Sequence, residues 1–374
     1  MQFKQVIGQS AIKQQLTKTM RSGRMPHAQL FLGPKGCGKL ALALASAQYL
    51  LCENPQEGDS CGTCRQCIKA SKMIHPDLHF SYPTVGSKAI STHFLDTWRA
   101  EIPDNPYMDV NQWLLALGAE NKQGNITRDE CVDILKKFSF KIFEGNYKIL
   151  ILWLPEYLAR EGNRLLKLIE EPQPNTAFFL VAENAELILN TILSRCQVVS
   201  IPAISDDDIV THLVGHHQLT EEHATSITYL AGGNFNTALQ LMGEAVNDNT
   251  DILLDWFRIA WSGHGGKMVD WVDAFAKKGR ENQKHFIDYA LHFLREMLIV
   301  KLDPGIRVRL QKGELDRATA MAKVLDSGQV ESIMTILNDC YYHIERNAHP
   351  KVLMLNVSIQ IHKIFKRKPK LANA

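Results

Sequence analysis

The stretch that decides the fold is AQLFLGPKGCGKL, residues 28–40. Residues 28–32 form a short, mostly apolar run that predicts a buried strand, and the glycine-rich turn 33–38 follows at once. The Ala- and Leu-rich segment 40–51 then predicts a helix. Strand, glycine-rich loop and helix in this order are the context that a phosphate-binding loop requires.

This loop has the residues that hold phosphate but lacks one that holds metal. Gly33, Gly36 and Gly38 allow backbone N–H groups to approach phosphates, and Lys39 supplies a positive charge to the outer phosphate oxygens. The next residue should be Ser or Thr, whose hydroxyl binds Mg²⁺, but it is Leu40, which has no lone pair to offer. The sequence therefore predicts a degenerate loop that does not hydrolyse ATP, and it leaves open nucleotide binding without turnover.

The next predicted core strand lacks the acids that an ATPase needs. Residues 148–153 are a nearly continuous apolar run, typical of a buried parallel strand. Active ATPases close this strand with two acids, one for the metal and one for water, but Trp153 and Leu154 stand here and Glu156 comes a few residues late. Two independent defects at the same metal strengthen the prediction of a non-hydrolysing loop.

Strands and helices alternate over the first 200 or so residues and then give way to helices alone. Further buried strands are predicted at 177–182 and 197–201, which indicates an α/β fold with a doubly wound parallel sheet. We predict three domains: residues 1–203 around the sheet, a small helical domain at 204–245, and an all-α domain at 250–374.

Four of the eight cysteines lie in one segment of 16 residues, 52–67. Cys52, Cys61, Cys64 and Cys67 supply four thiolates, enough for tetrahedral zinc, and the glycines and proline between them let the chain wrap around an ion. All four ligand positions would come from protein, so the predicted Zn²⁺ is structural. Reduced free thiols and an iron–sulfur cluster remain as alternatives.

The composition excludes several classes of function. A net charge of +2 over 374 residues provides no strong field for nucleic acid, which argues against DNA or RNA binding as the main role of this chain. No apolar run reaches the 18 or so residues that span a bilayer, and the first ten residues lack the apolar core of a signal peptide. We expect a cytoplasmic protein without membrane contact.

The order of several motifs resembles the clamp-loader branch of the AAA+ ATPases. The matching segments are VIGQ at 6–9, RMPHA at 24–28, LFLG at 30–33, NRLLKLIEEP at 163–172 and LSRC at 193–196. The resemblance implies a P-loop AAA+ domain, a helical lid and an all-α C-terminal collar. It also implies a zinc insertion at about 52–67, after the loop helix.

Within this family, the absent groups resemble those of the delta-prime type of subunit in the bacterial DNA polymerase III clamp loader. In the lid segment 232–239, Asn236 stands where motor subunits carry an arginine, and asparagine cannot bring a positive charge to a phosphate. Arg195 of the Ser-Arg-Cys motif is retained, and the resemblance implies that it is an arginine finger acting in trans. Pairing of Arg195 with a local carboxylate is the alternative.

The resemblance also implies partners and a role in DNA replication. A delta-prime-type subunit would act as a non-hydrolysing stator beside the gamma or tau motor subunits and the delta subunit. The resemblance implies that the assembled complex loads the sliding clamp and contacts DNA. The alternative is a catalytically active clamp-loader ATPase of the gamma/tau type.

One segment departs from the family pattern. Residues 80–125 are longer than the family has there, and the sequence predicts no function for them. Trp98, Tyr107 and Trp113 lie within the segment, which predicts that it packs as helix and loop.

Overall fold

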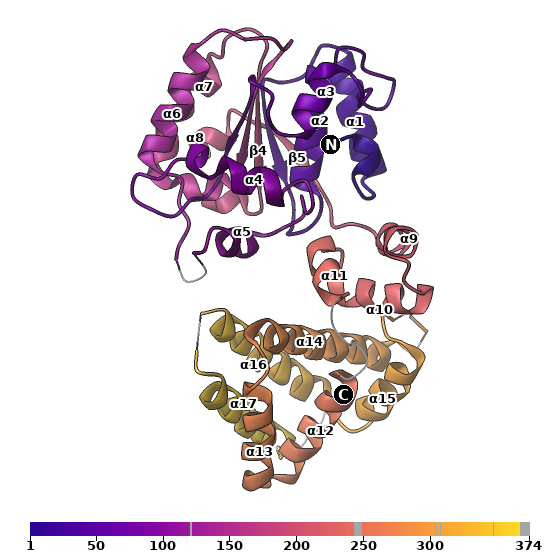
Figure 1. Cartoon of the computed structure of the whole chain (residues 1–374). Helices are drawn as coiled ribbons and strands as arrows, with labels where there is room; N and C mark the ends of the chain where they lie inside the picture. The colour runs from indigo at the N-terminus through magenta and orange to yellow at the C-terminus, as the bar shows by residue number, and fades with distance from the viewer. Residues whose placement is uncertain (120–121, 243–248, 304, 307, 347, 367–374) are drawn as a thin grey trace. The chain divides into compact units, whose positions relative to one another are not determined.

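A five-stranded parallel sheet organises the first part of the chain (Figure 1). The computed structural model describes residues 1–374 apart from 120–121, 243–248, 304, 307, 347 and 367–374. The strands are β1 (Ala28–Leu32), β2 (Leu78–Ser81), β3 (Lys148–Trp153), β4 (Thr176–Ala182) and β5 (Gln197–Ser200), in the order β2-β3-β4-β1-β5. All neighbours are parallel, which confirms the predicted doubly wound sheet.

The register brings the ends of β1, β4 and β5 together at one edge of the sheet. Leu32 is opposite both Ala182 and Ser200. The loop that follows β1 therefore lies beside the residue that follows β4. In a parallel sheet this carboxyl edge is where ligands bind.

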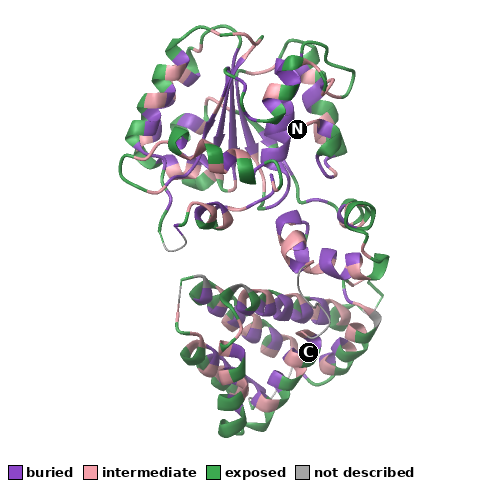
Figure 2. Ribbon diagram, viewed as in Figure 1, coloured by how far each residue is buried: buried purple, intermediate pink, exposed green. Residues whose placement is uncertain are grey.

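Helices cover both faces of the sheet (Figure 1). The helices up to residue 241 are α1 (Ser10–Arg21), α2 (Lys39–Leu51), α3 (Arg65–Ser71), α4 (Leu95–Glu101), α5 (Val110–Ala116), α6 (Arg128–Ser139), α7 (Leu166–Glu170), α8 (Asn190–Leu193), α9 (Asp206–His217), α10 (Glu221–Ala231) and α11 (Phe235–Leu241). Every residue of α2 is buried, as expected for a helix that is apolar all round. On the opposite face, α6, α7, α8 and the 3₁₀ segment η3 (Pro155–Leu165) pack against the strands. Figure 2 shows the central strands buried along their length.

The N-terminus of α6 explains how the additional segment is attached. Thr127 caps the helix by accepting a hydrogen bond from the Glu130 backbone N–H at 3.1 Å. The Glu130 carboxylate accepts a hydrogen bond from the Ser91 backbone N–H at 2.6 Å. Burial raises the pKa of this carboxyl group. The helix cap thus holds the segment 80–125 against the sheet.

The described part of the segment 80–125 packs as helix and loop around Trp98, as predicted. It contains η2 (Ser91–Phe94), α4 and α5. Tyr82 stacks on Trp98 with ring centroids 4.1 Å apart, and Trp113 meets it edge-on at 5.2 Å. Trp153, the last residue of β3, lies 5.5 Å from the same ring. The segment is therefore part of the core.

The chain divides into two compact units, residues 1–224 with 231–240 and residues 225–230 with 241–374. The described elements that begin after residue 248 are all helical: α12 (Asn249–Ser262), α13 (Gly265–Ala276), α14 (Arg280–Leu302), α15 (Lys312–Ala322), α16 (Ser327–Glu345) and α17 (Pro350–Phe365). Their core is continuous, and the Trp256 indole N–H donates to Ser358 Oγ at 2.8 Å.

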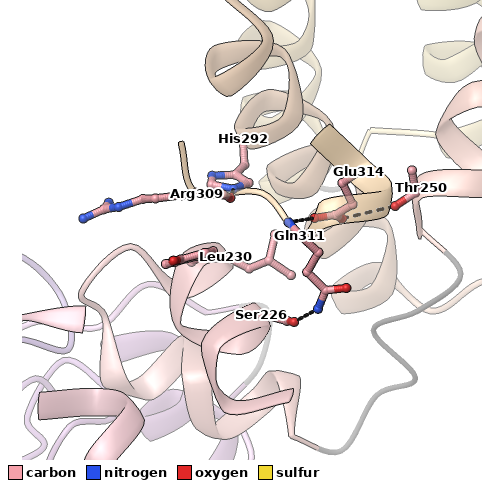
Figure 3. Close-up of a pocket in the computed structure, with 8 residues that line it drawn as sticks. Ser226, Leu230, Thr250, His292, Arg309, Gln311 and Glu314 are labelled. Carbon is pink, nitrogen blue, oxygen red and sulfur yellow. Dashed lines mark hydrogen bonds between the residues drawn. The ribbon is translucent and has the colours of Figure 1, made fainter. Parts of the chain in front are cut away.

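A small polar cluster attaches residues 225–230 to the second unit (Figure 3). Ser226 bonds with the Gln311 side chain, and Glu314 accepts from the Tyr289 hydroxyl at 2.6 Å. Glu314 also accepts from the Gln311 backbone N–H at 3.0 Å, which completes a capping box for α15. Ser226, Gln311 and Glu314 also line a small pocket beside His292.

No helix among the described residues is long and apolar enough to cross a membrane.

Truncating Trp98 should destabilise the first unit strongly. Trp98→Ala removes a fully buried ring from the centre of the aromatic cluster, and we expect a loss of about 3–5 kcal/mol in the free energy of unfolding. Chemical denaturation followed by circular dichroism measures this loss. Phe143→Ala is the control, since that ring is 80% exposed and its loss should cost within about 0.5 kcal/mol. Equal effects of the two substitutions would contradict the packing described here.

Candidate functional site

The glycine-rich loop lies between β1 and α2 in the backbone conformation that its glycines allow. Gly36 has φ +65° and Gly38 has φ +88°, the left-handed region that favours glycine. Gly33 donates its N–H to the Ala182 carbonyl at 3.2 Å, which fixes the start of the loop to the end of β4. The structure thus brings the predicted loop residues together at the carboxyl edge of the sheet.

Lys39 does not point a free charge out of this loop. Its side chain is only 6% exposed. The ammonium Nζ donates to the Pro34 carbonyl at 3.0 Å, within the loop itself, and lies 3.4 Å from Glu183 Oε1. A buried ammonium needs partners of this kind. The charge that would meet phosphate is therefore bound by the chain itself.

Glu183 is a site residue that the sequence analysis missed. It follows β4 directly, and β4 is the neighbour of β1. The first residue after each buried parallel strand lies at the ligand-binding edge, so its position is the signal that could have identified it.

The three positions expected to serve a loop-bound metal, 40, 153 and 154, carry buried apolar side chains. Leu40 is buried within α2, and Trp153 packs on Trp98. Glu156, the late acid, accepts from the backbone N–H groups of Glu183 and Asn184 at 2.6 and 2.9 Å through Oε1. Burial raises the pKa of Glu156. The two hydrogen bonds of Glu156 fix the backbone that follows β4.

Residues of the lid segment lie directly over the loop. The Phe235 backbone N–H donates to the Gly36 carbonyl at 3.2 Å. A β-carbon on Gly36 would lie 1.7 Å from Asn234 Oδ1, so this side chain fills the space above the glycine. Asn236 is buried and accepts from Asn105 Nδ2 at 2.9 Å. Position 236, where the resemblance led us to expect an arginine in a motor subunit, thus holds a neutral amide bonded to Asn105.

Arg195 lies between α8 and β5, away from the groups that hold Lys39. Its side chain is 31% exposed. Nε donates to Glu170 Oε1 at 2.6 Å, and Nη1 donates to the Thr191 carbonyl at 2.6 Å. The local carboxylate that the sequence left as an alternative is thus its partner in the single chain. Because the side chain is partly exposed, it remains accessible from outside.

The four clustered cysteines come together between the C-terminus of α2 and the first turn of α3. Their sulfur atoms all lie within 4.8 Å of one another. The backbone N–H groups of Cys61, Cys64 and Cys67 donate to the sulfurs of Cys52, Cys61 and Cys64 at 3.3–3.4 Å. Such donors stabilise thiolates.

The spacing of the cluster fits a tetrahedral metal ion. The sulfurs of Cys61 and Cys67 are 3.9 Å apart. Four bonds of about 2.3 Å to zinc in tetrahedral geometry would place sulfurs about 3.8 Å apart. This donor set could therefore hold a metal ion such as zinc, with no ligand position left for a substrate.

Comparison with known proteins identifies the family. A family model described as DNA polymerase III, delta subunit, matches residues 8–205. The tau subunit of DNA polymerase III from Bacillus subtilis is 25% identical over 94% of this chain and 59% of its own length. The delta' subunit from the same organism is 27% identical over 55% of this chain and 51% of its own length. The delta' subunit of Haemophilus influenzae is 25% identical over 78% of this chain and 76% of its own length.

Among solved structures, a DNA polymerase III gamma subunit-related protein from Thermotoga maritima aligns with 94% of this chain and 100% of its own. The TM-score is 0.40 and the identity 13%. For several relatives, including two tau subunits and a delta' subunit, the alignment spans about half of the relative's length (44–59%). The family model covers more than half of the present chain, which confirms the clamp-loader resemblance inferred from the motifs. The chain belongs to the DNA polymerase III delta subunit family, and its relatives include both delta' and tau or gamma subunits.

Proposed function

We propose that this chain is a delta-prime-type clamp-loader subunit that does not hydrolyse ATP and donates Arg195 to the ATP site of a neighbouring subunit. The observation that carries the proposal is the binding of Lys39 by Pro34 and Glu183 within the chain. A lysine held in this way must give up both partners before it can meet a phosphate. Leu40 and Trp153 leave the same site without two of its metal-binding groups.

Arg195 can leave its local partner at little cost. An ion pair between partly exposed side chains contributes about 0–1 kcal/mol. An arginine finger supplied to a neighbouring phosphoryl-transfer site raises the rate by about 10³–10⁵, equivalent to about 4–7 kcal/mol. The gain exceeds the cost, so pairing with Glu170 is compatible with a role in trans.

The cysteine cluster is proposed to hold one structural Zn²⁺. Segment 52–67 would otherwise have to fold around a few buried side chains, and metal ligation supplies the missing stabilisation. The proposed partners are the gamma or tau motor subunits, the delta subunit and the sliding clamp, with DNA reached through the assembled complex. Residues 1–203, 204–245 and 250–374 are proposed as AAA+ domain, lid and collar.

Removing the finger should lower the ATPase of the complex without unfolding this chain. Arg195→Ala deletes the guanidinium, and we expect hydrolysis to fall by about 10³-fold or more at the one site that it completes. Steady-state ATPase of the reconstituted complex, with clamp and primed DNA, measures the effect. The total ATPase rate of the complex should fall by the fraction that this one site contributes.

Two controls separate a finger from a structural arginine. Glu170→Gln removes the local ion pair and should leave the ATPase unchanged, whereas a purely structural role would make this variant as defective as Arg195→Ala. Arg21→Ala removes another exposed, ion-paired arginine and should have no effect. Unchanged hydrolysis in the Arg195→Ala complex would refute the assignment.

The isolated chain should not bind ATP with Mg²⁺. Lys39 is bound internally and the metal lacks ligands, so calorimetric titration should yield no binding heat in either the natural chain or Lys39→Ala. Saturable micromolar binding that disappears in Lys39→Ala would favour the alternative, an active clamp-loader ATPase of the gamma/tau type.

The purified chain should contain one zinc per molecule. Cys64→Ser replaces one thiolate, so we expect lower zinc content and a lower melting temperature, measured by atomic absorption and thermal denaturation. Cys340→Ala is the matched control, because that buried thiol lies outside the cluster and should leave the zinc content unchanged. Iron instead of zinc, or no metal in the natural chain, would contradict the proposal.

A further inference from the structure

Tyr107, in the segment 80–125, contacts three parts of the loop region at once. Its side chain is buried, and its hydroxyl accepts a hydrogen bond from the Ile7 backbone N–H at 2.9 Å. Its ring lies against the left-handed turn of the loop, where a β-carbon on Gly38 would be 3.1 Å from the ring edge. The same ring meets Phe235 edge-on, with centroids 5.0 Å apart.

Asn105 fixes Tyr107 in this position and makes a contact of its own. Asn105 Oδ1 accepts from the Tyr107 backbone N–H at 3.1 Å, and Asn105 Nδ2 donates to Asn236 Oδ1 at 2.9 Å. All of these groups lie within residues 1–224 and 231–240, the first compact unit. One short connection between α4 and α5 therefore joins the N-terminal segment, the loop and the lid segment.

This connection lies between the glycine turn and the lid segment, because the Tyr107 ring touches Gly38 on one side and Phe235 on the other. A ligand whose phosphates rest on the loop amides must extend past the glycine turn, between that turn and the lid segment. Tyr107 lies there and supplies the interactions of a base: an aromatic ring against Phe235 and a polar atom on a backbone N–H. Tyr107 and Phe235 also line a cavity of about 340 Å³. None of the described residues that line this cavity belongs to the glycine-rich loop, 33–40, so the cavity does not include the loop.

We propose that residues 105–107 act as a built-in substitute for a nucleotide, holding the lid segment on the loop at all times. The proposal deepens the proposed stator role, on which it rests: it assigns the rigidity of the subunit to named contacts. A tethered group has a high effective concentration, so it occupies the site without regard to the nucleotide level in the cell.

Hydrogen–deuterium exchange on the full-length chain tests this role directly. The Phe235 N–H, bonded to Gly36, reports on the lid segment, and the Ile7 N–H, bonded to Tyr107, reports on the substitute itself. In Tyr107→Ala we expect exchange in 232–240 and around residue 7 to be at least about tenfold faster, while β3 stays protected. Tyr107→Phe keeps the ring, so only the Ile7 N–H should exchange faster.

The outcomes decide the proposal without reference to ATPase activity. Tyr147→Ala, a half-buried tyrosine of the same unit, is the control and should leave 232–240 unchanged. Exchange in 232–240 within about twofold of the natural chain in Tyr107→Ala would overturn the proposal. If that variant also loses protection in β3, Asn105→Ala decides in its place: faster exchange in 232–240 supports the substitute, and unchanged exchange overturns it. Because the isolated chain is measured, failure here leaves the Arg195 experiment unaffected.

Discussion

The loop region is organised around one buried ammonium group, that of Lys39, which needs hydrogen-bonding and charged partners. Lys39 begins a helix whose residues are all buried, so its charge cannot be left to water. Glu183 supplies the counter-charge because β4 is the neighbour of β1 in the sheet. The Pro34 carbonyl supplies a second partner by curling the loop around the lysine. Loop shape and the orientation of the lysine therefore meet a single electrostatic requirement, and the strand order supplies the acid that satisfies it.

The cysteine-rich segment 52–67 and the segment 80–125 both contact the short N-terminal segment, residues 3–9. Asp59, within the cysteine-rich segment, accepts from the backbone N–H groups of Phe3 and Lys4 at 2.9 and 3.0 Å. Tyr107, from the segment 80–125, accepts from Ile7. Gln9 then reaches the Cys37 carbonyl at 3.1 Å. Residues 3–9 are thereby fixed from both ends, and neither segment is independent of the loop.

The elements that the sequence predicted well are those whose signal is local. Buried parallel strands such as 148–153 appear as apolar runs, and the ligand spacing of the cysteine cluster lies within 16 residues. β2 escaped prediction because it is only four residues long and contains His79. The partnership of Lys39 with Glu183 and of Tyr107 with Ile7 joins residues 100 or more positions apart. No single-sequence pattern encodes such contacts, because they depend on strand order and on how an additional segment packs.

The candidate site could be predicted only in part, because it too depends on contacts between residues far apart in the sequence. The absence of metal-binding groups at Leu40 and Trp153 could be inferred from position alone, since an apolar side chain has nothing to offer a cation. The side chains that fill the space left by these groups could not be inferred from position. Asn236 illustrates the difference: the missing positive charge is evident in the sequence, whereas its bond to Asn105 emerges only when the lid segment and the segment 80–125 are brought together.

The contacts over Gly36 and Gly38 separate the phosphate-loop pattern from the ability to bind phosphate. A single methyl group at position 36 would collide with Asn234, and one at position 38 would press on Tyr107. Packing within this chain therefore demands both glycines whether or not a nucleotide ever occupies the loop. A glycine-rich motif of this kind can persist under purely structural selection. In proteins built this way, a phosphate-loop motif is not by itself evidence of a nucleotide site.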